Sequence, residues 1–152
     1  MTTVFSYTVA RGGHPVALSR FTNEVTLIVN TASQCSFTNY NIHLLNDLQK
    51  AYESKHFTVL AFPCAQFGGQ EPLSNDGLAQ WVEQQRICFP VFDRVSLKGK
   101  GVHPLFQMLQ RELGSAKWNY TKFLCSRDGI PHAKYDPAAT HSTIARVIEQ
   151  FL

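Results

Sequence analysis

The chain has 152 residues, of which 44% are hydrophobic and 12% aromatic, and this is enough to build a sizeable core in one domain over residues 1–152. The formal net charge is +3, and the basic residues neither form a run nor alternate with aromatic ones, which argues against a nucleic-acid partner. The most apolar stretch, Val25 to Val29, is too short to span a membrane, and Met1 to Gly13 lacks the pattern of an export signal. A cytoplasmic location without membrane insertion is therefore expected.

The N-terminal part of the chain predicts a β-hairpin followed by a buried strand. Thr3 to Val9 and Pro15 to Leu18 are expected to be the two hairpin strands, joined by a turn at Arg11-Gly12-Gly13. Val25 to Asn30 is an almost continuous apolar run, which is typical of a central strand that is buried on both faces. A polar segment, Thr31 to Asn41, follows this strand.

A helix and a second buried strand come next. Apolar residues recur at helical spacing from Leu44 to Ser54, and the run FTVLAF at residues 57–62 predicts another strand buried on both faces. A strand, a helix and a strand in this order predict a parallel unit with a right-handed crossover. Pro63 ends the second strand, and a long loop follows it.

The second half of the chain predicts two more helices, a strand, a hairpin and a last helix. In order, these are a helix at 76–85, a strand at 91–95, a helix from about Pro104 to Leu113, a hairpin of 120–125 with 133–135, and a helix over 144–151. Asp128-Gly129 is a strong hairpin signal. A strand–helix–strand unit followed by a hairpin and a terminal helix is the thioredoxin-like plan. We therefore predict an α/β fold with a central mixed β-sheet flanked by helices and an N-terminal β-hairpin.

Cys35 is the strongest candidate for a reactive residue. It follows the first central strand and precedes the first long helix, so it lies at the carboxyl end of a strand, where ligands bind in open α/β sheets. The positive end of the helix dipole and the free N–H groups of the first turn both stabilise a thiolate relative to a thiol. Its neighbours Ser33, Gln34, Ser36 and Thr38 are polar, unlike a core environment.

The other three cysteines, Cys64, Cys88 and Cys125, carry no such signal. No pair forms a C-x-x-C motif, so the sequence has no local signature of a zinc site. A chain of this length does not need a disulfide framework to fold. Each of the three is expected to be a small buried hydrophobe.

Four segments in order and spacing resemble the glutathione peroxidase family: LIVNTASQCSFT at 27–38, FPCAQFGGQEP at 62–72, FPVF at 89–92 and WNYTKFL at 118–124. The chain resembles the cysteine-type members, because Cys35 stands where other members have selenocysteine. The resemblance implies a thiol peroxidase that reduces hydrogen peroxide and organic or lipid hydroperoxides by a cycle between thiolate and sulfenic acid, in protection against oxidative stress. It also implies that Cys35, Gln70, Trp118 and Asn119 form the catalytic group, with no bound cofactor or metal.

The residue types in this group suit the chemistry. Gln70 and Asn119 offer amide N–H groups and Trp118 an indole N–H, and none of them titrates near neutrality, so they stabilise the thiolate and the departing oxygen without adding charge. Taken singly, Gln70 could cap a turn, Trp118 could be a core residue and Asn119 a turn residue. Only their joint occurrence with Cys35 favours the catalytic interpretation.

The sequence leaves the resolution of the sulfenic acid open. Many cysteine-type relatives carry a resolving cysteine on the helix after the glutamine-containing loop, and aligning Ser74-Asn75 with the family puts that position at Val82. In one interpretation, which we favour, an external thiol such as glutathione resolves the sulfenic acid. In the other, Cys88 or Cys64 substitutes as the resolving cysteine, and thioredoxin is the reductant.

Two further features bear on assembly and on alternative functions. The segment between His103 and Trp118 is short, as in the monomeric relatives with an open active site, so we expect a monomer. Pro90 is a candidate for a cis peptide bond, although trans is the more frequent isomer.

The alternative functions are a peroxide sensor or redox-binding module that uses Cys35 without efficient turnover, and a hydrolase with a Cys35/His103 dyad, which lacks a nucleophile signature.

Overall fold

The computed structural model describes residues 2–152, so Met1 lies outside it. Its centre is a four-stranded sheet in the order β4-β3-β5-β6. The strands are β3 (Val25–Thr31), β4 (Phe57–Pro63), β5 (Lys122–Cys125) and β6 (Pro131–Tyr135). β3 pairs with β4 in parallel and with β5 antiparallel, and β5 pairs antiparallel with β6, so the sheet is mixed as predicted.

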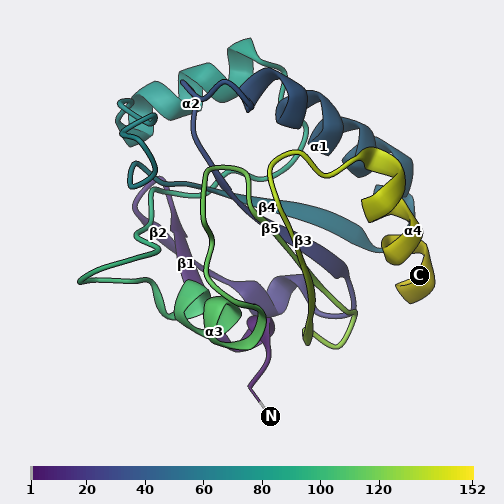
Figure 1. Ribbon diagram of the computed structural model, residues 1–152. Coiled ribbons are helices and arrows are strands. Elements are labelled where there is room, and N and C mark those ends of the chain that lie inside the picture. The colour runs from purple at the N-terminus through teal and green to yellow at the C-terminus, as the bar shows by residue number, and fades with distance from the viewer. Residues whose placement is uncertain (1) are drawn as a thin grey trace.

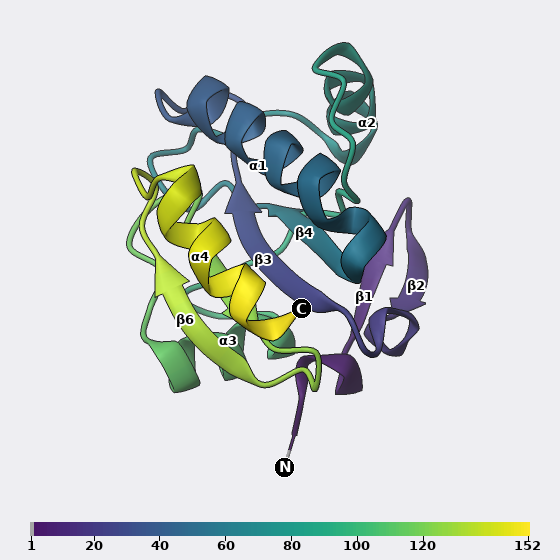
Figure 2. The same ribbon diagram turned by 90° about the vertical axis from the view of Figure 1, so that its right-hand side faces the viewer.

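All seven residues of β3 and of β4 are buried, because both faces of the sheet are covered. The helices are α1 (Thr38–Tyr52), α2 (Asn75–Gln84), α3 (Pro104–Leu113) and α4 (His141–Phe151). Figure 2 shows α1 and α4 on one face of the sheet and α3 on the other, and Figure 1 shows the same layers from the side. Leu27 and Val29 of β3 belong to the apolar cluster under α1 and α4, whereas Ile28 belongs to the cluster under α3.

The helix ends agree with their sequence signals. The hydroxyl of Ser74 accepts a hydrogen bond from the N–H of Gly77 at 3.1 Å and caps α2. His103 caps α3 through Nδ1, which accepts a hydrogen bond from Leu105 N at 3.1 Å, and Pro104 occupies the first turn. Burial lowers the pKa of His103, consistent with a neutral, structural imidazole. α1 begins at Thr38, inside the segment that we expected to precede the helix.

The N-terminal hairpin is confirmed with shifted bounds. Its strands are β1 (Thr8–Arg11) and β2 (His14–Ala17), which form a separate two-stranded sheet. Val4–Ser6 is a 3₁₀ turn, in place of the predicted strand, because the Thr3 hydroxyl accepts a hydrogen bond from Phe5 N and caps the turn. The second strand is followed at once by another 3₁₀ turn, Leu18–Phe21.

The strand predicted at 91–95 is wrong. Only Val91 forms a bridge with β4, at Ala61, whose N–H donates to Pro90 O and whose carbonyl accepts from Phe92 N. Pro90 has no N–H to extend the pairing, and one further bond, from Val95 N to Pro63 O, does not form a strand. The chain then turns to the hairpin, where Asp93 N donates to Ala10 O at 2.8 Å and the Asp93 carboxylate accepts from the N–H groups of Gly12 and Gly13 at 2.8 Å each. The Phe89–Pro90 bond is trans, as no cis peptide bond occurs over residues 2–152.

None of the helices over residues 2–152 is long and apolar enough to cross a membrane. α2 and the β1–β2 hairpin lie beyond the β4 edge of the sheet (Figure 2). The carboxyl ends of β3 and β4 point toward the start of α1, and this is where the candidate site forms.

Candidate active site

Cys35 lies in the turn between β3 and α1, and 8% of the residue is exposed. The backbone N–H of Phe37 donates a hydrogen bond to the Cys35 sulfur over 3.4 Å. Phe37 is the N-cap of α1 and its side chain makes no capping bond, so the sulfur accepts one of the free N–H groups of the helix start. The expected contact between the helix N-terminus and Cys35 is therefore present, although the residue is more covered than its polar neighbours indicated.

The turn that carries Cys35 is held by two hydroxyl groups. The carbonyl of Ala32 accepts hydrogen bonds from Tyr120 Oη at 2.6 Å and from Thr38 Oγ1 at 2.7 Å. Burial raises the pKa of Tyr120, which keeps the phenol a neutral donor. Thr38 Oγ1 also accepts from the N–H of Cys35 at 3.1 Å. Sequence reasoning missed Tyr120, whose partner lies 88 residues away.

Gln70 and Asn119 contact each other directly. Asn119 is fully buried, and its Nδ2 donates hydrogen bonds to Gln70 Oε1 and to the carbonyl of Phe67, at 3.0 Å each. The backbone carbonyl of Gln70 accepts from the N–H of Gln34 at 3.0 Å, next to Cys35 in the chain. The side chain of Gln70 thus has a partner across the site, which the turn-capping alternative did not require.

Trp118 lies over the glycine loop that carries Gln70. Its ring makes an edge contact with Phe67, with ring centroids 6.4 Å apart. A Cβ placed on Gly68 would lie 2.7 Å from Cη2 of Trp118 and 3.3 Å from Cδ and Nε2 of Gln70. The indole and the Gln70 amide therefore both lie against Gly68. Trp118 also packs against the apolar cluster that includes Cys35. The bond from Gln34 N to the Gln70 carbonyl places Gln70, together with Asn119 and Trp118, beside the turn that carries Cys35.

Two donors in this region have no protein acceptor. Within residues 2–152, neither Nε2 of Gln70 nor Nε1 of Trp118 donates a hydrogen bond to another residue. The carbonyl of Trp118 is fixed by Asn30 Nδ2 at 3.1 Å and by Thr121 Oγ1 at 2.8 Å. The site can therefore present neutral N–H groups to an anionic atom or to an oxygen on which negative charge develops.

The remaining cysteines differ from Cys35. Cys64 and Cys125 are fully buried, as predicted, and burial raises the pKa of both thiols, that of Cys125 to about 12. The prediction that Cys88 is buried is wrong: Cys88 is exposed, its N–H and its thiol donate to Asn46 Oδ1 at 3.0 and 3.2 Å, and the burial that remains raises its pKa. This contact with a distant helix has no signal in the local sequence.

Cys88 lies away from Cys35. Asn46 is eight residues beyond the start of α1 at Thr38, or about 12 Å along the helix axis. A disulfide needs the two Cβ atoms within roughly 4.5 Å. Cys88 therefore cannot pair with Cys35 without rearrangement. Cys35, Cys64, Cys88 and Cys125 are all free thiols.

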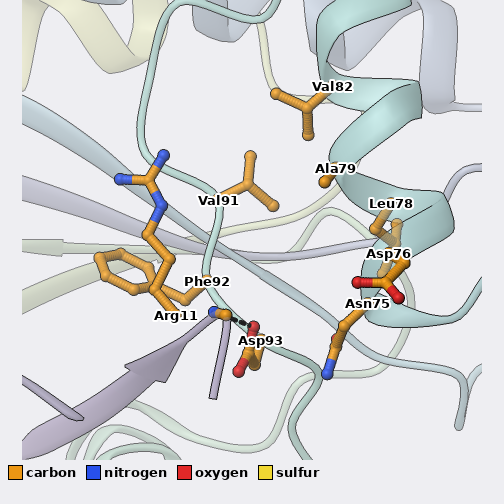
Figure 3. Close-up of a pocket in the computed structure, with 10 residues that line it drawn as sticks. Arg11, Asn75, Asp76, Leu78, Ala79, Val82, Val91, Phe92 and Asp93 are labelled. Carbon is orange, nitrogen blue, oxygen red and sulfur yellow. Dashed lines mark hydrogen bonds between the residues drawn. The ribbon is translucent and has the colours of Figure 1, made fainter. Parts of the chain in front are cut away.

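Val82, at the position of the family's resolving cysteine, lines a separate cavity of about 330 Å³ between α2, the tip of the β1–β2 hairpin and residues 91–93. Figure 3 shows Val82 and Val91 along this cavity, with the Arg11 guanidinium and the Asp76 carboxylate on opposite sides. None of the four predicted catalytic residues lines it. Over residues 2–152, no group of three or more His, Cys, Asp or Glu side chains could hold a metal ion.

Known proteins match this chain over most of its length. A family model described as "Glutathione peroxidase" matches residues 4–110. A probable phospholipid hydroperoxide glutathione peroxidase of Helianthus annuus is 41% identical over 146 residues, which cover 92% of this chain and 81% of that protein. Among solved structures, GPX1 of T. cruzi is 28% identical with a TM-score of 0.82, over 99% of this chain and 96% of that one.

A thioredoxin family protein of Chlorobium tepidum TLS has a TM-score of 0.76 at 14% identity, over 99% of this chain and 95% of that one, and it shows the fold alone. These matches confirm the predicted thioredoxin-like fold and the resemblance on which the functional prediction was based. The chain belongs to the glutathione peroxidase family and is a peroxidase, an oxidoreductase that reduces hydroperoxides.

Proposed function

We propose that Cys35 is the peroxidatic residue and that its thiolate attacks the terminal oxygen of a hydroperoxide. A sulfur–oxygen bond forms, the oxygen–oxygen bond breaks, and the departing oxygen leaves as water or an alcohol after taking up a proton. Cys35 becomes a sulfenic acid. The observation that carries this proposal is the Phe37 N–H on the sulfur, because a hydrogen-bond donor at a helix start stabilises a thiolate.

Gln70 and Trp118 supply the donors for the leaving oxygen. Neither N–H group donates to another residue within 2–152, and Gly68 lies against the Gln70 amide and against Cη2 of the Trp118 ring. Asn119 acts by orientation, since its bond to Gln70 Oε1 leaves the Gln70 Nε2 as the outward group. Removal of one such donor typically lowers a rate by on the order of 10²-fold when the donor acts on the transition state.

An external small thiol, glutathione, is the proposed reductant. The sulfenic acid condenses with one thiol to give a mixed disulfide and water, and a second thiol then releases the Cys35 thiolate and a small-molecule disulfide. This route is supported by the distance of Cys88 from the start of α1 and by the full burial of Cys64. Thioredoxin is the alternative reductant if a rearrangement brings an internal cysteine to Cys35.

Hydrogen peroxide and organic or lipid hydroperoxides are the proposed substrates. The lipid class is supported by the name of the relative from Helianthus annuus, which is a probable phospholipid hydroperoxide glutathione peroxidase. A monomeric state and a cytoplasmic location stay predictions from the sequence. The family relationship favours a peroxidase with turnover over the sensor alternative.

Mass spectrometry of the peroxide-treated protein, with and without glutathione, tests both steps. We expect a sulfenic acid on Cys35 without the thiol and a glutathione adduct on Cys35 with it. Cys35→Ser should abolish hydroperoxide consumption, whereas Cys88→Ser, an exposed control thiol, should leave it unchanged. Full consumption by Cys35→Ser would contradict the proposal. A disulfide between Cys35 and another cysteine of the chain would favour thioredoxin as the reductant in place of glutathione. Fast oxidation of Cys35 that neither reductant reverses would favour the sensor alternative.

A further inference from the structure

Glu71 is a buried carboxylate whose partners are all hydrogen-bond donors. It is 1% exposed, and its oxygens accept from Ser33 N at 3.0 Å, Ser33 Oγ at 2.7 Å and Leu73 N at 3.3 Å. The two ion pairs found over residues 2–152 are His43–Asp47 and Arg111–Glu112, so no cation balances Glu71. Burying an acidic group without a cation is costly, and the three donors at Glu71 offset part of that cost.

The carboxylate joins the two segments that carry the proposed reacting groups. Ser33 is two residues before Cys35, and Gln70 immediately precedes Glu71 in the chain. The bond from Gln34 N to the Gln70 carbonyl, at 3.0 Å, is the other link between these segments. Two of the three bonds to Glu71 come from the Cys35 turn and the third from its own loop. Glu71 therefore fixes the position of one segment relative to the other.

We infer that Glu71 is a positioning residue for peroxide reduction, whose carboxylate holds the Gln70 amide in register with the Cys35 sulfur. This inference rests on the proposed function. Peroxide reduction needs the sulfur, the peroxide oxygens and a donor for the leaving oxygen to be in line. A hydrogen-bonded clamp between the two loops provides this alignment without adding a charge that contacts the substrate.

Glu71→Gln is the direct test. The variant has nearly the same size, but its amide accepts through one oxygen only. It therefore loses either the bond from Ser33 N, which Oε1 accepts, or the bonds from Ser33 Oγ and Leu73 N, which Oε2 accepts. We expect the second-order rate of Cys35 oxidation by hydrogen peroxide to fall by on the order of 10- to 100-fold, the effect of a small misplacement of a reacting group. The rate of Cys35 alkylation by iodoacetamide should stay equal or rise, because alkylation needs the thiolate and not the donor on Gln70.

Ser33→Ala removes only the 2.7 Å bond at a half-exposed position and is the milder, matched variant. It should show a smaller loss of the same kind, in peroxide rate but not in alkylation rate. A double-mutant cycle adds a second readout: if Glu71 acts through Gln70, then Glu71→Gln combined with Gln70→Ala should be no slower than Gln70→Ala alone.

Equal losses of peroxide and alkylation rates, or additive losses in the cycle, would overturn the inference and leave Glu71 a structural residue. A Glu71→Gln protein with the wild-type peroxide rate would also overturn it. The proposed function fails separately, if Cys35→Ser retains peroxide reduction or Gln70→Ala oxidises at the wild-type rate.

Discussion

Asn119 Nδ2 donates a hydrogen bond to Gln70 Oε1 at 3.0 Å, across 49 residues of sequence. The bond defines which end of the Gln70 amide is outward, because the oxygen is engaged and the nitrogen is not. Asn119 also donates to the carbonyl of Phe67, so a single buried side chain holds both the loop and the glutamine that the loop carries.

Asn119→Ala should therefore slow peroxide reduction by leaving Gln70 free to rotate. We expect Cys35 oxidation to be roughly 10- to 100-fold slower, and unfolding to cost about 1–3 kcal/mol less because the buried carbonyl of Phe67 and the partly buried Oε1 of Gln70 lose their donor. Gln49→Ala is the control, since Gln49 is also buried, accepts from Val59 N at 2.8 Å and donates to Phe57 O at 3.5 Å, without contacting Gln70 or the turn that carries Cys35. Stopped-flow oxidation and urea unfolding separate the two effects: if both variants oxidise equally slowly for equal losses of stability, Asn119 has no orienting role.

Gly68 and Gly69 are a matched pair of positions at which alanine variants test whether the reaction depends on the position of the Trp118 ring. Both have positive φ, +73° and +60°, so alanine costs roughly 1–2 kcal/mol of backbone strain at either position. A Cβ on Gly68 would lie 2.7 Å from the Trp118 ring, whereas a Cβ on Gly69 would meet nothing within 4 Å. Gly68→Ala should therefore destabilise the fold more and also displace the indole.

The expected readout is a peroxide rate at least about tenfold lower for Gly68→Ala and close to wild type for Gly69→Ala. Tryptophan fluorescence should shift for the first variant only. Equal rates for the two alanine variants would show that the contact between Gly68 and the indole does not matter for the reaction.

The sequence was sufficient for the fold because its main signals are local. The continuous apolar run of β3 and the helical spacing in α1 and α4 need no distant partner to be read. The strand expected at 91–95 failed for the opposite reason, since Asp93 binds the hairpin amides 80 residues away. A pattern of neighbouring residues cannot show that a distant segment competes with strand pairing for this part of the chain.

The residues of the candidate site also divide into those that the sequence predicted and those that it did not. Cys35 was placed by its position before a helix, and the other three residues only by family resemblance. The residues that hold them were not predicted, because Glu71 meets Ser33 across 38 residues and Tyr120 meets Ala32 across 88. The exposure of Cys88 was missed for the same reason, as its partner Asn46 comes from another helix.

Thiol labelling should separate the cysteines of the native protein by burial. Burial raises the pKa of Cys125 to about 12, so roughly one molecule in ten thousand carries that thiolate at pH 8, and Cys64 is shifted in the same direction. We expect iodoacetamide to leave both unmodified over hours in the folded protein and to modify both in urea. Peptide mapping measures this, and rapid labelling of either residue without denaturant would contradict the burial described here.

Lys122 should give the stability an unusual dependence on alkaline pH. Its side chain is fully buried on β5, and Nζ donates to the carbonyls of Asp136 and Pro137 at 3.3 Å each. Burial lowers the pKa of Lys122 to about 8, from 10.5, despite the opposing effect of the Asp136 charge. Between these two values the unfolded chain binds the proton and the folded chain does not, so this group makes the free energy of unfolding rise with pH.

The magnitude is at most about 3.4 kcal/mol, from 1.36 kcal/mol for each unit between the two pKa values, and it is gained as pH rises from about 8 to about 10.5. Buried thiols and phenols with raised pKa values act in the opposite direction, but Lys122→Met shares them, so they cancel in a comparison. The measurement is urea unfolding of the wild type and of Lys122→Met across this range. The free energy of unfolding of the wild type should rise with pH relative to that of Lys122→Met. A difference between the two that does not change with pH would mean that Lys122 keeps its proton in the folded protein.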